Sequence, residues 1–228
     1  MTHRNASIFA RPELAALARD ELALLPAYAR RQPSCRALIV YPHVSARALP
    51  LDLPAWQVTR LHVEDGRLQG DSSCELDHLP WPEDSFDLVQ VQHAADVLEP
   101  IEAFVDEIGR VLRPGGVVLW SGLNALGSWR SWCRLRSGAS LPLLPAGALR
   151  RLLDRSGLAI EDSYHVGRFW PRSAAAGDRA ASAVDVFRAA WVLAARKRRA
   201  NLTLLARRNV RPAVPARLAA VPSRRACA

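Results

Sequence analysis

The chain has 228 residues, half of them apolar, so it is long enough to bury the core of one ordinary globular domain. Its net charge of +9 is unevenly placed: residues 194–228 hold ten basic and no acidic residues, which leaves 21 basic against 22 acidic residues elsewhere. The body of the chain is therefore nearly neutral, which excludes a strongly basic nucleic-acid-binding domain.

The spacing of the cysteines and the hydropathy of the chain predict its cellular location. Four cysteines stand far apart, with neither the paired spacing of a metal site nor a disulfide framework: Cys35, Cys74, Cys133 and Cys227. No stretch approaches the roughly 20 apolar residues that cross a bilayer, and the N-terminus leads into no apolar signal core. We expect a reducing cytoplasmic location, no metal and no membrane partner.

The first predicted element is a helix within residues 12–25, where Leu14, Leu17, Leu22 and Leu25 are spaced for one apolar face. Apolar runs at residues 37–41 and 58–63 then predict two strands. We expect the helix to pack on the edge of the sheet that these strands begin.

Residues 79–120 predict strand, helix, stop and second strand without a break. Prolines and polar residues at 80–85 lead into a strand at 86–91. From Ile101 to Leu112 apolar residues recur at helical spacing. Arg-Pro-Gly-Gly at 113–116 ends that helix, and the apolar run at 117–120 is typical of a strand covered on both faces. The pattern predicts half of a parallel α/β sheet.

The order LPWPEDSFDLV, then EIGRVLRPGGVVLW, resembles class I S-adenosylmethionine-dependent methyltransferases, especially the type-11 methyltransferase domain. Residues 149–158 resemble the helix and turn before that family's sixth strand, and residues 191–197 its seventh strand. The resemblance implies a Rossmann-like, doubly wound, mostly parallel seven-stranded α/β sheet with an antiparallel seventh strand. Residues 12–31 also resemble the helix that precedes the first strand in a small bacterial subgroup of the family.

The resemblance divides the chain into three parts. Residues 1–35 form an N-terminal helical segment packing on the core, residues 36–197 form the methyltransferase-like domain, and residues 198–228 form a basic tail without periodicity, which we expect to be disordered. The implied cofactor is S-adenosylmethionine, and the methyl acceptor is not indicated.

The chain departs from the family pattern after its first strand. There the family has a glycine-rich loop, because the backbone must approach the cofactor closely. Residues 41–45 are Tyr-Pro-His-Val-Ser, with no glycine, and Pro42 lacks an N–H donor. Two interpretations stay open: the cofactor sits differently, contacted by Tyr41 or His43, or the pocket has stopped binding it.

The family also has an acid after its second strand, which accepts hydrogen bonds from the ribose hydroxyls. Glu64, followed by Asp65, stands at this position. A Glu-Asp-Gly turn is equally what a surface hairpin or loop carries.

A second family acid, four residues before the Leu-Pro pair at 79–80, accepts from the adenine amino group. Glu75 matches this spacing, with Leu76 supplying a backbone contact to the base and Asp71 as the fallback acid. The alternative for both acids is a solvated loop carboxylate.

Gln92 and His93 follow the strand at 86–91, where the family places methionine-side and substrate-side contacts. The His93 imidazole could accept a proton from an oxygen or nitrogen nucleophile as a catalytic base. Alternatively, His93 lines the pocket or caps the next helix. Methyl transfer from a sulfonium needs mainly alignment, so a base is not obligatory.

Residues 121–132 have the composition of a loop over the strand ends. Asn124 could offer its amide to a substrate there. Trp129 and Trp132 form either an aromatic lid or a cover for the sheet edge.

The sequence therefore predicts an S-adenosylmethionine-dependent methyltransferase of unknown acceptor. The alternative is a catalytically inactive scaffold that binds nucleic acid weakly through the arginine-rich tail, although this tail lacks the aromatic residues that stack bases. No P-loop and no GxGxxG pattern is present, which argues against phosphate-binding and nicotinamide enzymes.

Overall fold

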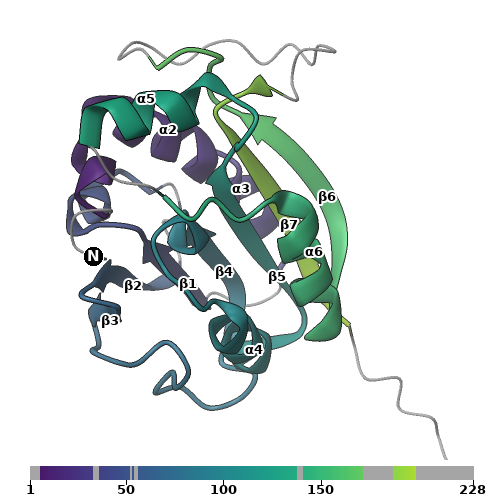
Figure 1. The fold of residues 1–228 in the computed structure, drawn as a ribbon. Coiled ribbons are helices and arrows are strands. Elements are labelled where there is room, and N and C mark those ends of the chain that lie inside the picture. The colour runs from purple at the N-terminus through teal and green to yellow at the C-terminus, as the bar shows by residue number, and fades with distance from the viewer. Residues whose placement is uncertain are drawn as a thin grey trace, which may run out of the picture.

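The computed structural model describes residues 6–32, 36–51, 53, 56–137, 141–171 and 187–198. The predicted tail beyond residue 198 lies outside the described residues, as do Cys35 and Cys227. The described strands form one seven-stranded sheet in the order β3-β2-β1-β4-β5-β7-β6 (Figure 1). Their bounds are β1 (Arg36–Tyr41), β2 (Gln57–Glu64), β3 (Arg67–Gly70), β4 (Phe86–Gln92), β5 (Leu112–Leu123), β6 (Leu158–Val166) and β7 (Ala190–Lys197).

The strand directions confirm the predicted fold class. Strand β1 pairs in parallel with β2 and β4, and β4 pairs in parallel with β5. Strand β7 lies antiparallel between β5 and β6. The sheet is therefore doubly wound and mostly parallel, with the seventh strand reversed.

Strand β3 is a second reversed strand, which the sequence interpretation did not assign. Asp65 and Gly66 both have positive φ, at 48° and 79°, and Glu64 pairs directly with Arg67. Two central residues with positive φ make the hairpin turn that matches strand twist, and Asp-Gly is a preferred sequence for it. The Glu-Asp-Gly segment is thus a tight hairpin, and the chain reverses there instead of crossing over through a helix.

The helices surround the sheet in a layered arrangement (Figure 1). Their bounds are η1 (Ser7–Ala10), α2 (Pro12–Leu22), α3 (Leu25–Ala29), η2 (Val44–Ala48), η3 (Ala94–Asp96), α4 (Glu102–Val111), α5 (Ser128–Ser137) and α6 (Ala146–Arg155). The single helix predicted within residues 12–25, and compared with the family over 12–31, is divided into α2 and α3. A continuous helix is not possible because the Pro26 ring, in the first turn of α3, would clash with the carbonyl of residue 22.

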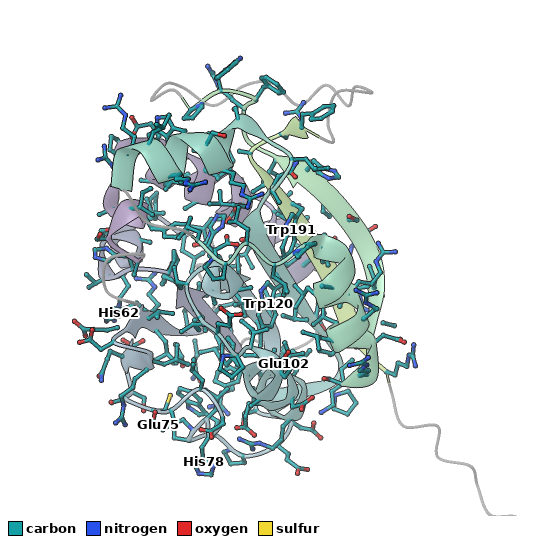
Figure 2. The ribbon with its side chains drawn as sticks, viewed as in Figure 1. His62, Glu75, His78, Glu102, Trp120 and Trp191 are labelled. Atoms are coloured by element: carbon teal, nitrogen blue, oxygen red, sulfur yellow. The ribbon has the colours of Figure 1, made fainter. Side chains whose placement is uncertain are left out.

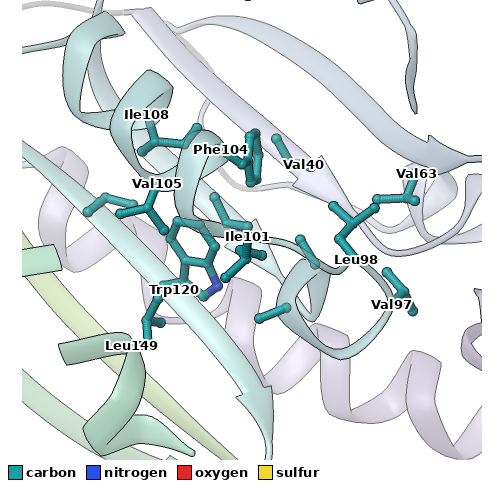
Figure 3. Close-up of a cluster of buried hydrophobic side chains, with 14 of the residues drawn as sticks. Val40, Val63, Val97, Leu98, Ile101, Phe104, Val105, Ile108, Trp120 and Leu149 are labelled. Atoms are coloured by element: carbon teal, nitrogen blue, oxygen red, sulfur yellow. The ribbon is translucent and has the colours of Figure 1, made fainter. Parts of the chain in front are cut away.

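Each face of the sheet carries its own apolar cluster. Residues Leu38 and Val40 of β1 face the cluster with α4, while Ile39 and Tyr41 face the cluster with α3, as alternation along a strand requires. In the first cluster, the rings of Phe104 and Trp120 meet at 5.7 Å between centroids (Figure 3). The predicted apolar stripe of α4 is confirmed by this packing.

The segment after β5 differs from the predicted loop. Strand β5 continues to Leu123 and α5 begins at Ser128, so only four residues connect them. Trp129 is buried and donates from Nε1 to the carbonyl of Arg168 at 2.7 Å, and Trp132 stacks edge-on against it. The two tryptophans hold α5 against the end of β6, which favours a packing role for them over an open lid.

Candidate functional site

The carboxyl ends of β1, β4 and β5 lie together at one edge of the sheet. In doubly wound sheets, ligands bind beside this edge, at the point where successive connections leave in opposite directions. Here that point lies between β1 and β4, because β2 lies on one side of β1 while β4 and β5 lie on the other. The residues that end these strands therefore form the candidate site.

A fully buried polar cluster fills the edge beyond β4 and β5. Glu21 of α2 is 0% exposed, and its Oε1 lies 2.9 Å from Nε2 of His93. Its other oxygen, Oε2, accepts hydrogen bonds from Gln92 Nε2 at 3.0 Å and from Ser121 Oγ at 2.8 Å. A carboxylate from the N-terminal helix therefore occupies the position where the strands end.

The backbone conformation of His93 directs its imidazole ring into this cluster. His93 has φ of 49°, a left-handed conformation that is strained for a residue with a Cβ. Its Nδ1 lies 2.9 Å from Asp96 Oδ2, which also accepts from the Leu123 backbone N–H at 2.8 Å. The Phe9 ring covers the imidazole, with 5.0 Å between centroids. His93 is thus enclosed between two carboxylates under the N-terminal residues.

The two carboxylates determine the charge of His93. Burial alone favours the neutral imidazole, but the Glu21 and Asp96 carboxylates outweigh it and raise the pKa of His93 to about 10. Burial raises the pKa of Asp96, and the His93 imidazolium opposes that rise. Near neutral pH, His93 is therefore a cation with both ring nitrogens facing carboxylates, and in this conformation it has no free nitrogen to accept a proton.

Some acceptors in the cluster lack donors. Gln92 Oε1 and Asp96 Oδ1 are buried without a hydrogen-bond partner among the described residues. The Nε2 of Gln92 donates hydrogen bonds to Glu21 and to the carbonyl of Ala18, the latter at 3.1 Å. Buried polar atoms are nearly always satisfied, so unsatisfied acceptors indicate stored strain or a group that the chain itself does not supply.

A small hollow lies beside this cluster, at the ends of β1 and β2. It is lined by Ala6, His43, Val44, His62, Val63, Glu64 and Asp65. Its volume is about 30 Å³, room for about two water molecules and far below the ~300–1,000 Å³ of ligand pockets. Glu64 Oε2 lies 3.7 Å from His62 Nε2, and burial lowers the pKa of His62. His43 Nδ1 accepts from the Ser45 backbone N–H at 3.2 Å and so caps η2.

Two further predicted contacts have other surroundings or partners. Tyr41 is buried, and burial raises the pKa of its phenol. It lies on the same face of the sheet as Gln92, since Val40 pairs with Val91, but its hydroxyl has no hydrogen-bond partner among the described residues. Asp71 joins η2 to β2, since it pairs with Arg47 at 2.7 Å and accepts from the Arg60 backbone N–H at 2.7 Å. These two side chains have structural partners or surroundings of their own.

Glu75 and Leu76 lie beyond β3. The Glu75 carboxylate pairs with Arg67 at 2.8 Å and is half exposed, while Leu76 packs against the core (Figure 2 shows Glu75 well away from Trp120 and Trp191). The structure therefore brings together His43 with Glu64, and Gln92 with His93. Asp71 and Glu75 are paired with arginines instead, and Tyr41 and Leu76 pack in apolar clusters.

Sequence reasoning missed Glu21, Asp96 and Ser121. One signal could have identified Glu21: it falls on the buried stripe of α2 with Leu14, Leu17 and Ala18, where an acid has no solvent to face. Nothing in the local sequence marks Ser121, whose role depends on the neighbouring strand.

Comparison with known proteins gives the family. Residues 41–120, from the end of β1 into β5, match the family described as "Methyltransferase domain". This part of the chain is similar to methyltransferase domains. The matched residues include the hollow's Glu64 and the buried pair Gln92 and His93, but not Glu21, which precedes them.

A curated relative agrees with this assignment. The ubiquinone biosynthesis O-methyltransferase of Bradyrhizobium sp. (strain ORS 278) is 28% identical over 111 residues. The alignment covers 47% of this chain and 43% of that protein, so the chain spans less than half of the relative's length.

Solved structures share the fold. A chain from the complex between the Haloferax volcanii Trm112 methyltransferase activator and a methyltransferase aligns with a TM-score of 0.53 and 12% identity, over 87% of this chain and 98% of that one. An S-adenosylmethionine-dependent methyltransferase from Thermotoga maritima aligns with a TM-score of 0.52 and 14% identity, over 81% and 91%. At these identities, the likeness establishes the class I methyltransferase fold alone.

Proposed function

We propose that this chain is an S-adenosylmethionine-dependent methyltransferase whose ligand site is closed here by residues 6–22, the N-terminal segment. The observation that carries the proposal is the hollow at the ends of β1 and β2, which has the Glu64 carboxylate at its rim. In nucleotide-binding α/β folds, an acid at this position hydrogen-bonds ribose hydroxyls. Glu64 is the residue to which we assign that contact, with His43 on the neighbouring wall.

In the closed conformation, the hollow does not fit the cofactor. A volume of about 30 Å³ excludes a purine nucleoside, and the side chains of His43 and Val44 line the hollow where a glycine-rich loop would present backbone alone. Ala6 lines the hollow and Phe9 covers His93, so binding requires the start of the N-terminal segment to move. S-adenosylmethionine, once bound, supplies a methyl group on a sulfonium.

The same movement would change His93. With Glu21 withdrawn, Asp96 would still hold Nδ1 and Nε2 would be released toward the strand ends, where an acceptor would lie. Gln92 and Ser121 would also lose their shared acceptor and become donors for a ligand. His93 is thus proposed as a base of the open state only, and the unsatisfied Gln92 Oε1 supports a ligand contact there.

A second candidate function is a catalytically inactive scaffold. The glycine-free residues 41–45, the small hollow and the complete burial of Glu21 favour it, because all three would follow if the ligand site had become part of the core. In that case, the Glu21–His93 contact is purely structural, and any nucleic-acid binding would rest on arginines beyond the described residues.

Calorimetric titration with S-adenosylhomocysteine and S-adenosylmethionine distinguishes the methyltransferase from the inactive scaffold. The methyltransferase proposal predicts saturable binding at one site per chain. Glu64→Gln should weaken it about 10–100-fold, since hydrogen bonds to a charged group contribute roughly 1.5–3 kcal/mol. Glu75→Gln is the matched control, because this acid is half exposed and paired with Arg67, and it should leave the affinity unchanged. Absence of heat at millimolar ligand would favour the scaffold.

A further inference from the structure

Exposed apolar side chains gather on one surface of the molecule. Among the described residues, six large apolar side chains are exposed, and five of them belong to α5 and the segments beside it. They are Leu126 at 71%, Leu135 at 85%, Phe169 at 43%, Trp170 at 62% and Phe187 at 43% exposure. Together with the exposed arginines of α5, these residues are called the α5 surface. Scattered single exposures are ordinary, but a concentration of this kind indicates an interaction site.

Contacts join the aromatic members of the α5 surface to the start of α5. Ser128 Oγ donates to the carbonyl of Phe169, which ties the start of α5 to the end of β6. The Phe169 ring lies 5.5 Å from the Trp170 ring and 6.3 Å from the Phe187 ring, measured between centroids. Leu126 precedes α5 and Leu135 lies in its last turn, so the patch extends along the helix. Figure 1 shows α5 and the adjoining ends of β6 and β7 at the same end of the molecule.

The α5 surface is also cationic. Arg130, Arg134 and Arg136 are exposed on α5, and no carboxylate pairs with them within the described part of the chain. The sequence contains no Asp or Glu between Glu107 and Asp154, so α5 has no acidic neighbour along the chain. Exposed arginines and exposed apolar side chains therefore occur together on α5 and the segments beside it.

We propose that the α5 surface binds the anionic surface of a lipid bilayer. Basic side chains are attracted to anionic headgroups, and Trp, Phe and Leu side chains insert at the boundary between headgroups and acyl chains. The sequence led us to expect no membrane partner because it holds no spanning stretch, and among the described residues no helix is long and apolar enough to span a bilayer. Surface binding needs no such helix.

Charge and composition argue against other occupants. Two copies of this face would bring unpaired arginines together, which disfavours a dimer through it. Single-stranded nucleic acid stacks its bases on aromatic rings. It would therefore not contact the two leucines, which are the most exposed members of the patch. A bilayer uses the arginines, the aromatic rings and the leucines together.

Co-sedimentation of the full chain with vesicles tests the proposal. The vesicles consist of phosphatidylcholine alone or of phosphatidylcholine mixed with phosphatidylglycerol. We expect strong binding only to the anionic vesicles, weakened by salt. The triple variant Arg130→Gln, Arg134→Gln, Arg136→Gln should bind on the order of 100-fold more weakly, since each arginine near the surface contributes about fivefold.

The matched control removes the same charge from another helix. Arg150→Gln, Arg151→Gln, Arg155→Gln changes three exposed arginines of α6, which carries none of the five exposed apolar side chains. Both triple variants keep the arginines of residues 198–228, so the difference between them reports α5 alone. A separate variant, Leu135→Ser with Trp170→Ser, should lower binding at least tenfold and leave the salt dependence unchanged, because it removes apolar insertion only.

Three outcomes would overturn the proposal. The first is equal vesicle binding by the two triple variants, and the second is no binding of the unaltered chain to anionic vesicles at low salt. The third is α5-dependent binding of polyuridylic acid by a chain whose vesicle binding does not depend on α5, which would assign the face to nucleic acid. All substituted side chains are exposed, so unchanged circular dichroism and melting temperature serve as the folding control. None of these outcomes depends on whether S-adenosylmethionine binds.

Discussion

The carboxylate of Glu21 lies 2.9 Å from the imidazole of His93, and both side chains are almost completely excluded from water. This contact joins the N-terminal helix α2 to the carboxyl end of β4. Because Glu21 also accepts hydrogen bonds from Gln92 and Ser121, one side chain connects the N-terminal segment to two adjacent strands. The contact therefore fixes the position of α2 against the ends of β4 and β5.

Removing this carboxylate should destabilise the fold. Glu21→Ala leaves the His93 cation and two hydrogen-bond donors without their partner, and breaking a buried pair in this way costs about 3–5 kcal/mol. We expect a loss of that size in the free energy of unfolding, measured by urea denaturation. Glu13→Ala, on the same helix but partly exposed, should change it by less than about 1 kcal/mol. A loss for Glu21→Ala no larger than for Glu13→Ala would mean that the pair is not formed.

The contribution of His93 to stability should depend on pH. Its pKa is raised to about 10 in the fold, against an ordinary value near 6.5, so the charged form is favoured by folding. That stabilisation is complete below about pH 6.5 and is lost as the pH rises toward 10, at no more than about 1.4 kcal/mol per pH unit. The difference in unfolding free energy between the unaltered chain and His93→Gln should therefore shrink over this range. A difference that stays constant from pH 6 to pH 10 would contradict the ion pair; His78→Gln, at an exposed position, is the control.

Local patterns in the sequence predicted most of the fold. The strand β4 and the helix α4 follow from prolines and polar residues ahead of Phe86 and from the apolar spacing that places Phe104 and Ile108 in the core. The reversal of β3 depends on the positive φ of Asp65 and Gly66. A surface hairpin or loop was one of the two interpretations of Glu-Asp-Gly, although the strand that follows it was not predicted. These features are set by near neighbours in the chain.

The candidate site was predicted less completely because it depends on distant partners. Gln92 and His93 were predicted as contacts at the end of β4, and the structure places both side chains in the buried cluster. Their surroundings are determined by Glu21, which reaches them only through the docking of α2. Tyr41 was expected near the site because it ends β1, and it lies on the same face of the sheet as Gln92, but its hydroxyl makes no hydrogen bond to any described residue. Position at the end of a strand does not specify the partners of a side chain.

Substitution of two glycines, one in the hairpin after β2 and one in α6, should change stability in opposite directions. Gly66 has φ of 79° with nothing within 4 Å of an added Cβ, so Gly66→Ala should destabilise by about 1 kcal/mol through backbone strain alone. Gly147 lies in the first turn of α6 with equally open surroundings and no positive φ, so Gly147→Ala should stabilise by up to about 1 kcal/mol. Thermal unfolding checks both; a stabilising Gly66→Ala would rule out the turn described here.

Two buried tyrosines should respond differently to loss of the hydroxyl. The Tyr28 hydroxyl donates to Asp162 Oδ2 at 2.7 Å and lies 2.8 Å from the Tyr164 hydroxyl, so Tyr28→Phe should destabilise by about 1–2 kcal/mol. The Tyr41 hydroxyl is buried with no hydrogen-bond partner among the described residues, so Tyr41→Phe should be neutral or stabilising. Chemical denaturation of the two variants measures the contrast. A clear loss for Tyr41→Phe would reveal a hydrogen bond to this hydroxyl.

The most direct test is calorimetric titration of the unaltered chain and of Glu21→Gln with S-adenosylhomocysteine. Glutamine has nearly the shape of glutamate and can still accept from Gln92 and Ser121, but it removes the charge that pairs with His93. If the N-terminal segment closes the site, weakening its attachment raises the fraction of open molecules, and the apparent affinity rises with that fraction. We predict binding that is at least about tenfold tighter for Glu21→Gln. Equal affinity in the two proteins, or no binding by either, would contradict the proposed closure of a working ligand site.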